Sequence, residues 1–340
     1  MQDKTSVKQR ENPFANFSVF DFLYKYGTVI VVIGTLLFFS LTLNNFFTFS
    51  NISNVFRSVS IVTLIALAIT MSLTVNGLDL SVGATAGFAS VIAAKMMVIW
   101  ELGPLPAIIV PLIVGVVIGA INAFLIIKIK ISDMLATLSM MFVLTGVSIT
   151  FQSGSAIYNF MPLPNLGGIA PGTMQRTFLN IGQGTVGRIP IPVIIMLVVV
   201  AVVHVFLNYT KYGRYLYMTG GNKEAAKLSG IPVNRYVVLA YVLSGFLAAL
   251  GGLVLGARLG SGEVNAGAPY LMDAVAAAYI GFSVLGIGKP NALGTLLGAL
   301  LMGILLNGLV MMDFPYYSQD IVKGMVLIFA LGLTYYKRKE

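Results

Sequence analysis

The sequence predicts an all-α integral membrane protein of about ten transmembrane helices, interrupted by short broken or re-entrant elements. Of its 340 residues, 57% are hydrophobic and only 10% are charged, whereas a soluble domain carries about 25% charged residues. Long apolar runs follow one another along the chain, and glycine-containing breaks separate them. A chain of this composition cannot cover a water-facing surface.

Ten apolar runs are candidates to cross the bilayer, which takes about 20 residues of helix. Helices are expected because strands facing lipid would alternate polar and apolar residues. Span two is short, and span eight is shorter still. Glycines four residues apart, such as Gly115 and Gly119, predict close helix crossings. The ten runs cover residues 27–47, 58–75, 82–99, 105–127, 134–151, 189–207, 236–257, 271–285, 292–311 and 321–336.

The distribution of lysine and arginine predicts the orientation. Lys and Arg concentrate in alternate loops, and cytoplasmic loops carry the excess of these residues. An even number of spans therefore places both termini on the cytoplasmic side of the membrane. The predicted organisation is a cytoplasmic segment 1–26, a transmembrane domain 27–336 with a cytoplasmic loop 210–235, and a cytoplasmic tail 337–340.

Several classes of function are not expected. The chain has no cysteine and a single histidine, His204, so a thiolate or histidine metal site is not expected. Residues 286–290, "GIGKP", lack the first glycine and the hydroxyl residue of a phosphate-binding loop. No nucleophile–base pair or acidic cluster predicts an enzyme. The net charge of +9 follows the loops rather than one stripe, so no nucleic-acid partner is expected.

The cytoplasmic loop 210–235 contains signals of a short helix. Asn222 is an N-cap residue ahead of residues 224–228, and Gly230 and Pro232 end the helix. A capped helix held between two spans is typical of a docking element. The outer loop 151–188 is rich in Gly and Pro, which is consistent with either an ordered external cap or a linker.

Polar residues within or beside the spans are the candidates to line a translocation path. A carboxylate there costs at least about 2.5–3.5 kcal/mol on insertion scales, so it faces a polar cavity or a partner. Asp79 can fix the break between spans two and three, cap the next helix, or contact a passing solute, and Asp273 is similar. The polar set is Asn76, Asp79, Ser81, Asn122, Asp133, Thr137, Asp273 and Asn307, of which Asn76, Asp79, Ser81, Thr137 and Asp273 are the candidates for the path or its helix break.

Five ordered motifs carry a resemblance to a known family. They are 77–83 "GLDLSVG", 136–138 "ATL", 220–231 "GGNKEAAKLSGI", 273–277 "DAVAA" and 294–300 "GTLLGAL". Over residues 50–336 the chain resembles the permease subunits of bacterial ATP-binding-cassette (ABC) importers for simple sugars, the ribose/galactose/xylose branch. Departures from the family pattern occur at Ser132–Asp133–Met134, Leu271 and Gly281–Phe282–Ser283.

The resemblance implies a translocation subunit without catalytic residues. It implies a second permease copy, expected as a homodimer, a separate ABC ATPase that holds ATP and magnesium, and an extracytoplasmic binding protein that delivers a monosaccharide. No cofactor is expected in this chain. The segment implied to couple to the ATPase comprises Gly220, Gly221, Asn222, Glu224, Ala225, Ala226, Leu228, Ser229 and Gly230. Two alternatives stay open: a nucleoside or sugar-like signal as cargo, and an ion-coupled secondary transporter in which Asp79 and Asp273 titrate.

Overall fold

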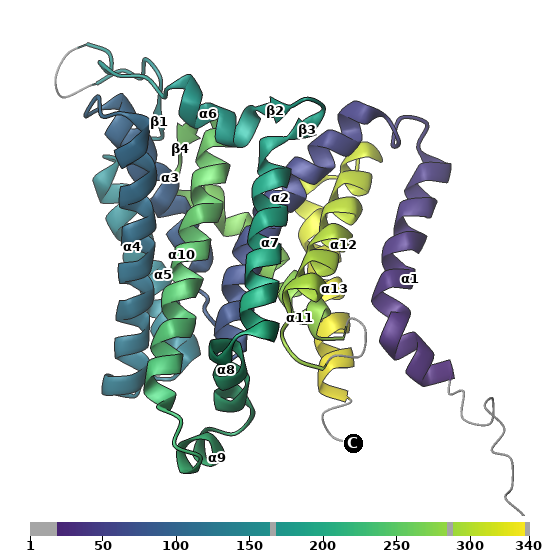
Figure 1. Cartoon of the computed structure of the whole chain (residues 1–340). Helices are drawn as coiled ribbons and strands as arrows, with labels where there is room; N and C mark the ends of the chain where they lie inside the picture. The colour runs from purple at the N-terminus through teal and green to yellow at the C-terminus, as the bar shows by residue number, and fades with distance from the viewer. Residues whose placement is uncertain (1–18, 164–167, 284–287, 337–340) are drawn as a thin grey trace, which may run out of the picture.

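The computed structural model describes residues 19–163, 168–283 and 288–336, and most of this chain is helical (Figure 1). Each of the ten predicted spans coincides with a helix, although the bounds differ. The predicted terminal segments lie partly outside the described residues, at 1–18 and 337–340. The ten helices are α1 (Val19–Thr42), α2 (Phe49–Leu73), α3 (Val82–Val98), α4 (Pro104–Phe124), α5 (Asp133–Phe151), α7 (Ile191–Tyr209), α10 (Val233–Leu259), α11 (Ala268–Ser283), α12 (Ala292–Met311) and α13 (Tyr316–Tyr336).

Several helices extend beyond the apolar runs that predict them. Helix α2 begins at Phe49 instead of residue 58, because the Thr48 side chain caps it by accepting from the Asn51 amide at 3.3 Å. Helix α4 continues as a π-helical turn, η1 (Leu125–Ile129), to Lys130 in the left-handed conformation. Among the described helices, six are long and apolar enough to span a bilayer, judged by length and composition.

Helix α2 is the central element of the bundle. Every residue from Val59 to Leu73 is buried, and α7, α10, α11 and α12 pack around it. Its hydroxyl residues bond within the helix, as Thr63 does to the Val59 carbonyl at 2.7 Å. A helix that is apolar on all sides is buried by its neighbours, and this burial holds the part of α2 that leads into the break after Leu73.

Helices α4 and α10 approach each other closely at glycines. An added Cβ at Gly119 would overlap the Tyr241 carbonyl oxygen, and one at Gly245 would overlap the Gly115 carbonyl oxygen. Small residues let helix backbones meet in this way inside a membrane. The predicted close crossing at Gly115 and Gly119 is therefore confirmed, and it brings Tyr241 beside the break that follows α2.

The two ends of the bundle carry different small elements (Figure 1). At one end lie the folded parts of the long loop 151–188, where β1 pairs with β4 from the connection between α10 and α11, and β2 pairs with β3. At the opposite end, α8 and α9 project below α7 and α10. These elements are β1 (Ile157–Tyr158), α6 (Arg176–Gln183), β2 (Thr185–Val186), β3 (Ile189–Pro190), α8 (Lys211–Gly221), α9 (Lys223–Leu228), β4 (Ser261–Gly262) and η2 (Val264–Gly267).

Candidate functional site

The break between α2 and α3 is a tight turn followed by extended chain, residues 74–81. Asn76 has a φ of 57°, in the left-handed region that asparagine tolerates better than most residues. The Gly77 amide donates to the Ser72 carbonyl at 3.1 Å, which closes the turn. A Cβ at Gly77 would lie 2.5 Å from the hydroxyl of Tyr241 in α10, so a larger residue there would require the Tyr241 side chain to shift.

Asp79 is the buried acceptor of this break. Its Oδ1 accepts from the Ser81 amide at 3.0 Å and from the Ser81 hydroxyl at 2.6 Å. Its Oδ2 accepts from Ser244 Oγ of α10 at 2.8 Å, and Asn122 of α4 donates to Ser81 Oγ at 2.9 Å. Asp79 is only 1% exposed. Because these bonds replace water, they offset the cost of burying the carboxylate.

Two side chains of α5 satisfy the backbone of the same break. Asp133 accepts from the Leu78 amide through Oδ2 at 2.7 Å, and Thr137 accepts from the Leu80 amide through Oγ1 at 3.1 Å. Buried backbone groups need such partners. Asp133, which departs from the pattern of the resembled family, is therefore a structural acceptor for the break.

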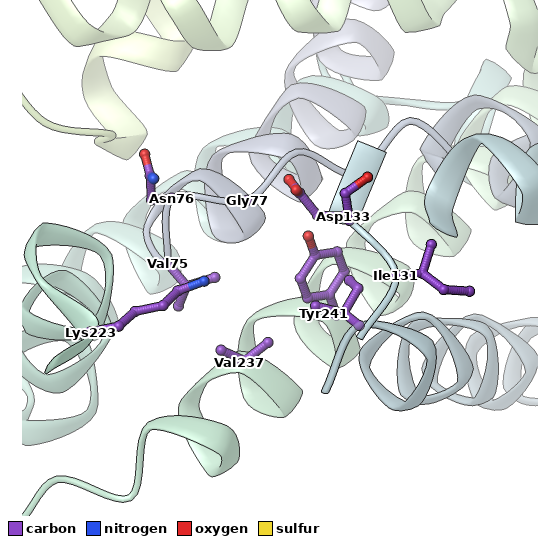
Figure 2. Close-up of a pocket in the computed structure, with 10 residues that line it drawn as sticks. Val75, Asn76, Gly77, Ile131, Asp133, Lys223, Val237 and Tyr241 are labelled. Carbon is purple, nitrogen blue, oxygen red and sulfur yellow. The ribbon is translucent and has the colours of Figure 1, made fainter. Parts of the chain in front are cut away.

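A cavity of about 190 Å³ lies beside the break, at the end of the bundle where α9 projects. Figure 2 shows Lys223 of α9 near Val75 on one side of it, with Asp133 and Tyr241 on the other. The buried Tyr241 hydroxyl has no hydrogen-bond partner in the described part of the chain. Binding sites for small molecules are typically about 300–1,000 Å³, so this cavity is too small to be a complete solute site.

The loop 210–235 forms two helices joined by a single residue. The Asn222 amide donates to the Met218 carbonyl at the end of α8, and its side chain accepts from the Ala225 amide at 3.0 Å to cap α9. Gly230 follows α9 with a φ of 79°. The capped helix predicted for residues 224–228 is thus present. The additional helix, α8, is absent from the sequence-based prediction.

Helix α9 presents most of its surface to solvent. Ala226 is buried, whereas Leu228 is 89% exposed and Glu224 and Lys227 are also exposed. The last turn of α8, just before α9, is closely packed. An added Cβ at Gly220 would overlap the Thr74 carbonyl oxygen, while one at Gly221 would meet no atom within 4 Å. The two glycines therefore differ in their surroundings: Gly220 packs against the break, and Gly221 has space for a side chain.

Comparison with known proteins identifies the family. The family described as "branched-chain amino acid transport system / permease component" matches residues 51–331. The chain belongs to this family of transport permeases. The ribose import permease of Haemophilus influenzae is 37% identical, with 94% of this chain and 96% of the relative aligned. The D-allose transport system permease of Escherichia coli is 31% identical, with 97% of each chain aligned. No solved structure matches the permease significantly.

Family membership and apolar helices together make the permease a multi-pass protein of the inner membrane. Among the described residues, no group of three or more Asp, Glu, His or Cys side chains is placed to hold a metal ion. The polar candidates divide into two places. Asp79, Ser81 and Thr137 are brought together, and Asn76 lines the adjacent cavity.

Asp273 is engaged elsewhere in the permease. It lies in α11, is 4% exposed, and pairs with Lys323 Nζ of α13 at 3.2 Å. Lys323 also lies 3.8 Å from the exposed Asp320. A charge inside a span needs a partner, so the lone lysine of span ten was a signal that could have identified this pair from sequence.

Other functional contacts of the permease carry no local signal in the sequence. Ser244 lies in the middle of an apolar run, and nothing near it indicates Asp79 as its partner. Tyr217 of α8 donates to the Pro290 carbonyl at 2.6 Å, across a long separation in sequence. Asn307 bonds to Asn51 at 3.0 Å and joins α12 to α2. These pairings arise from tertiary packing alone.

Proposed function

We propose that this permease is the membrane-spanning subunit of an ATP-driven ABC importer and forms the path for a monosaccharide. A binding protein outside the membrane delivers the sugar, and a separate ABC ATPase inside holds ATP and magnesium. The permease relatives named above are described as importing ribose or transporting D-allose, and another, from Escherichia coli, as importing galactose and methyl galactoside (31% identity). The long alignments with these relatives support a simple sugar as the cargo.

The observation that carries the proposal is the position of α9. It is a capped and largely exposed helix, it projects beyond the bundle, and only Asn222 separates it from a helix that packs on the break. An ATPase that presses on α9 therefore has a short physical route to residues 74–81. Both termini lie on this side in the proposed orientation, as the excess of basic residues favours.

The buried carboxylates among the described residues all have partners within the protein, which is consistent with a neutral solute. Asp79 is occupied by Ser81 and Ser244, and Asp273 is paired with Lys323. A sugar carries hydroxyl groups and no charge, so its passage needs only temporary replacement of its hydrogen bonds with water. An ion-coupled carrier needs a carboxylate that is accessible to the coupling ion, and these two carboxylates are buried and partnered.

The outer end offers a contact for an acidic partner. A hollow of about 630 Å³ there is lined in part by Arg57, Arg188 and Arg258, and none of the residues that line it is acidic. Complementary charge guides protein association, so we assign this hollow to the delivered binding protein. Apolar side chains exposed on many helices face lipid and, in our proposal, a second permease copy.

Charge reversal tests the outer contact. Arg188 is exposed beside Gly187 in the β2–β3 turn, where its replacement disturbs little packing. Arg188→Glu is expected to weaken the association between the permease and the binding protein and to make their affinity less sensitive to salt. Arg188→Lys is the matched control, since it keeps the charge. Equal binding by the wild type and Arg188→Glu would contradict the assignment.

An uptake experiment tests the function itself. Cells expressing the permease with its ATPase and binding protein are given labelled ribose, D-allose, galactose or a nucleoside. We expect uptake of one of the sugars that continues when ionophores collapse the ion gradients and stops when ATP is depleted. Uptake that follows the ion gradient would contradict ATP coupling, and uptake of the nucleoside alone would contradict a sugar cargo.

A further inference from the structure

Helix α8 contacts two interruptions of the bundle that are far apart in sequence. One is the break 74–81 between α2 and α3, and the other is the segment 288–291 that leads into α12. Its last turn touches the first through Gly220, and its middle touches the second through Tyr217. A single cytoplasmic helix therefore connects to both.

The contact with the first break is backbone against backbone. Gly220 lies so close to the Thr74 carbonyl that a methyl group has no space, and the neighbouring Asn76 amide is also close. The preceding residues Leu216 and Thr219 are fully buried. A close-packed interface of this kind resists sliding, because protein interiors have little free volume. A cavity lined by Val75, Asn76 and Gly77 lies next to the break and leaves space for it to shift.

The contact with the second interruption is polar. The Tyr217 hydroxyl donates to the Pro290 carbonyl at 2.6 Å, and Lys289 Nζ lies 4.5 Å from the centre of the Tyr217 ring. Burial raises the pKa of Tyr217 to about 12, so the hydroxyl stays protonated and able to donate at physiological pH. Asn291, next to Pro290, caps α12 at the Gly294 amide and donates to the Gly281 carbonyl of α11 at 2.8 Å.

The two interruptions are also joined inside the bundle. Near the end of α2, Thr70 Oγ1 lies 2.7 Å from Thr295 Oγ1 in the first turn of α12, and both side chains are buried. Below them, Asn222 ends α8 and caps α9, so no flexible linker separates the exposed helix from α8. A displacement of α9 is thus passed directly to α8.

We propose that Gly220 and Tyr217 are positioning residues through which α8 moves both helix interruptions together when α9 is displaced. This inference rests on the proposed function, since it needs an ATPase to displace α9. Coupling requires elements that move as connected bodies. Gly220 supplies the steric contact with 74–76, and Tyr217 supplies the bond to Pro290. Their loss disconnects hydrolysis from transport without removing the docking helix.

The test measures sugar imported per ATP hydrolysed by the complete transporter in proteoliposomes. Tyr217→Phe keeps the ring against Lys289 and removes only the donor to Pro290. Gly220→Ala forces α8 away from Thr74. Each substitution is expected to lower the ratio by about threefold or more while hydrolysis continues, a change of the size that one hydrogen bond contributes.

Two matched controls lie outside the proposed contacts. Gly146→Ala in α5 adds a methyl group where no atom lies within 4 Å, and Tyr212→Phe in α8 removes a hydroxyl from an exposed ring that stacks on Phe206. Both are expected to keep the wild-type ratio. A purely structural role would reduce hydrolysis and uptake together. Wild-type ratios in both Tyr217→Phe and Gly220→Ala would overturn the inference. A wild-type transporter that shows no ATP-dependent uptake would instead overturn the proposed function.

A distance measurement keeps the inference testable if one variant does not fold. The chain has no cysteine, so spin labels can be placed only where they are wanted. Lys227 in α9 and Leu293 in α12 are exposed. With labels at these positions we expect one narrow distance distribution, preserved when ATP binds, and a broader one in Tyr217→Phe. An ATP-dependent change in the wild-type distance, with no effect of Tyr217→Phe, would overturn the inference.

Discussion

Asp79 shows how a charge is kept inside an apolar bundle without a cation. Its carboxylate accepts from the Ser81 amide and hydroxyl and from the Ser244 hydroxyl, and Asn122 extends the network to α4. Both carboxylate oxygens therefore have partners, whereas the buried Asn122 Oδ1 has none among the described residues. The role that these contacts support is to fix the break, and in this conformation Asp79 is closed to a passing solute.

Removing the Asp79 carboxylate is expected to destabilise the permease. Asp79→Ala leaves the Ser81 and Ser244 hydroxyls buried without an acceptor, at about 1–3 kcal/mol for each unpaired group. Asp79→Asn keeps one acceptor oxygen and is expected to cost less. The apparent Tm in detergent is expected to fall from the wild type to Asp79→Asn and further to Asp79→Ala. Asn76→Gly is the control, because Asn76 is exposed and glycine tolerates its positive φ. An apparent Tm of Asp79→Ala equal to the wild type would contradict the structural role.

The Asp273–Lys323 pair gives a second prediction at this scale. Lys323→Met leaves Asp273 buried and unpaired, and breaking a buried pair costs about 3–5 kcal/mol. The double variant Asp273→Leu/Lys323→Met removes both charges and is expected to recover most of the loss, because apolar replacements of buried pairs are often neutral. Thermal stability of the two single variants and the double variant measures the interaction. Additive losses in the double variant would mean that the pair does not act as a unit.

Among the helices, the crossing of α4 and α10 holds the break against α10. Gly119→Ala would force the backbones apart at the Tyr241 carbonyl, and overpacking of this kind costs about 1–3 kcal/mol. Gly146→Ala in α5 is the control, since a methyl group there meets no atom. We expect a lower apparent Tm and reduced uptake for Gly119→Ala only. An equal result for the two variants would show that the crossing tolerates separation.

The sequence carried enough information for most helices and for α9. Apolar runs of membrane length predict spans because bilayer thickness sets helix length, and the Asn222 cap and Gly230 are local signals. Helix α8 was missed because its segment contains Gly213, Gly220 and Gly221, which lower helix propensity. Capping of α8 by Thr210 and close packing on its neighbours override that preference.

The candidate site was predicted in part. Asp79, Ser81 and Thr137 were recognisable as polar residues in apolar surroundings, and the structure brings them to one break. Their partner Ser244 and the Tyr217–Pro290 bond depend on which helices meet, and the spacing of residues along the chain does not encode that. The start of α2 was placed too late because residues 50–57 are polar enough to resemble a loop.

At the scale of the whole molecule, the two ends of the bundle differ. One end presents arginines around a hollow, and the opposite end presents α9, next to α8, which contacts both helix interruptions. Helix α2 lies between them, buried from Val59 to Leu73 and tied to α12 through Thr70 and Thr295. In our proposal, a displacement of α9 reaches the centre of the bundle through these packed contacts rather than through a flexible loop.

Labelling of single cysteines in intact cells shows which side of the membrane α9 faces, and the absence of natural cysteines makes each label specific. Lys227→Cys in α9 and Thr185→Cys in β2 both place the thiol at an exposed position, at opposite ends of the bundle. With a reagent that cannot cross the membrane, we predict labelling at 185 from outside and at 227 only after the cells are opened. Labelling at 227 in intact cells would place α9 outside, out of reach of ATP, and would rule out coupling to an ATPase through α9.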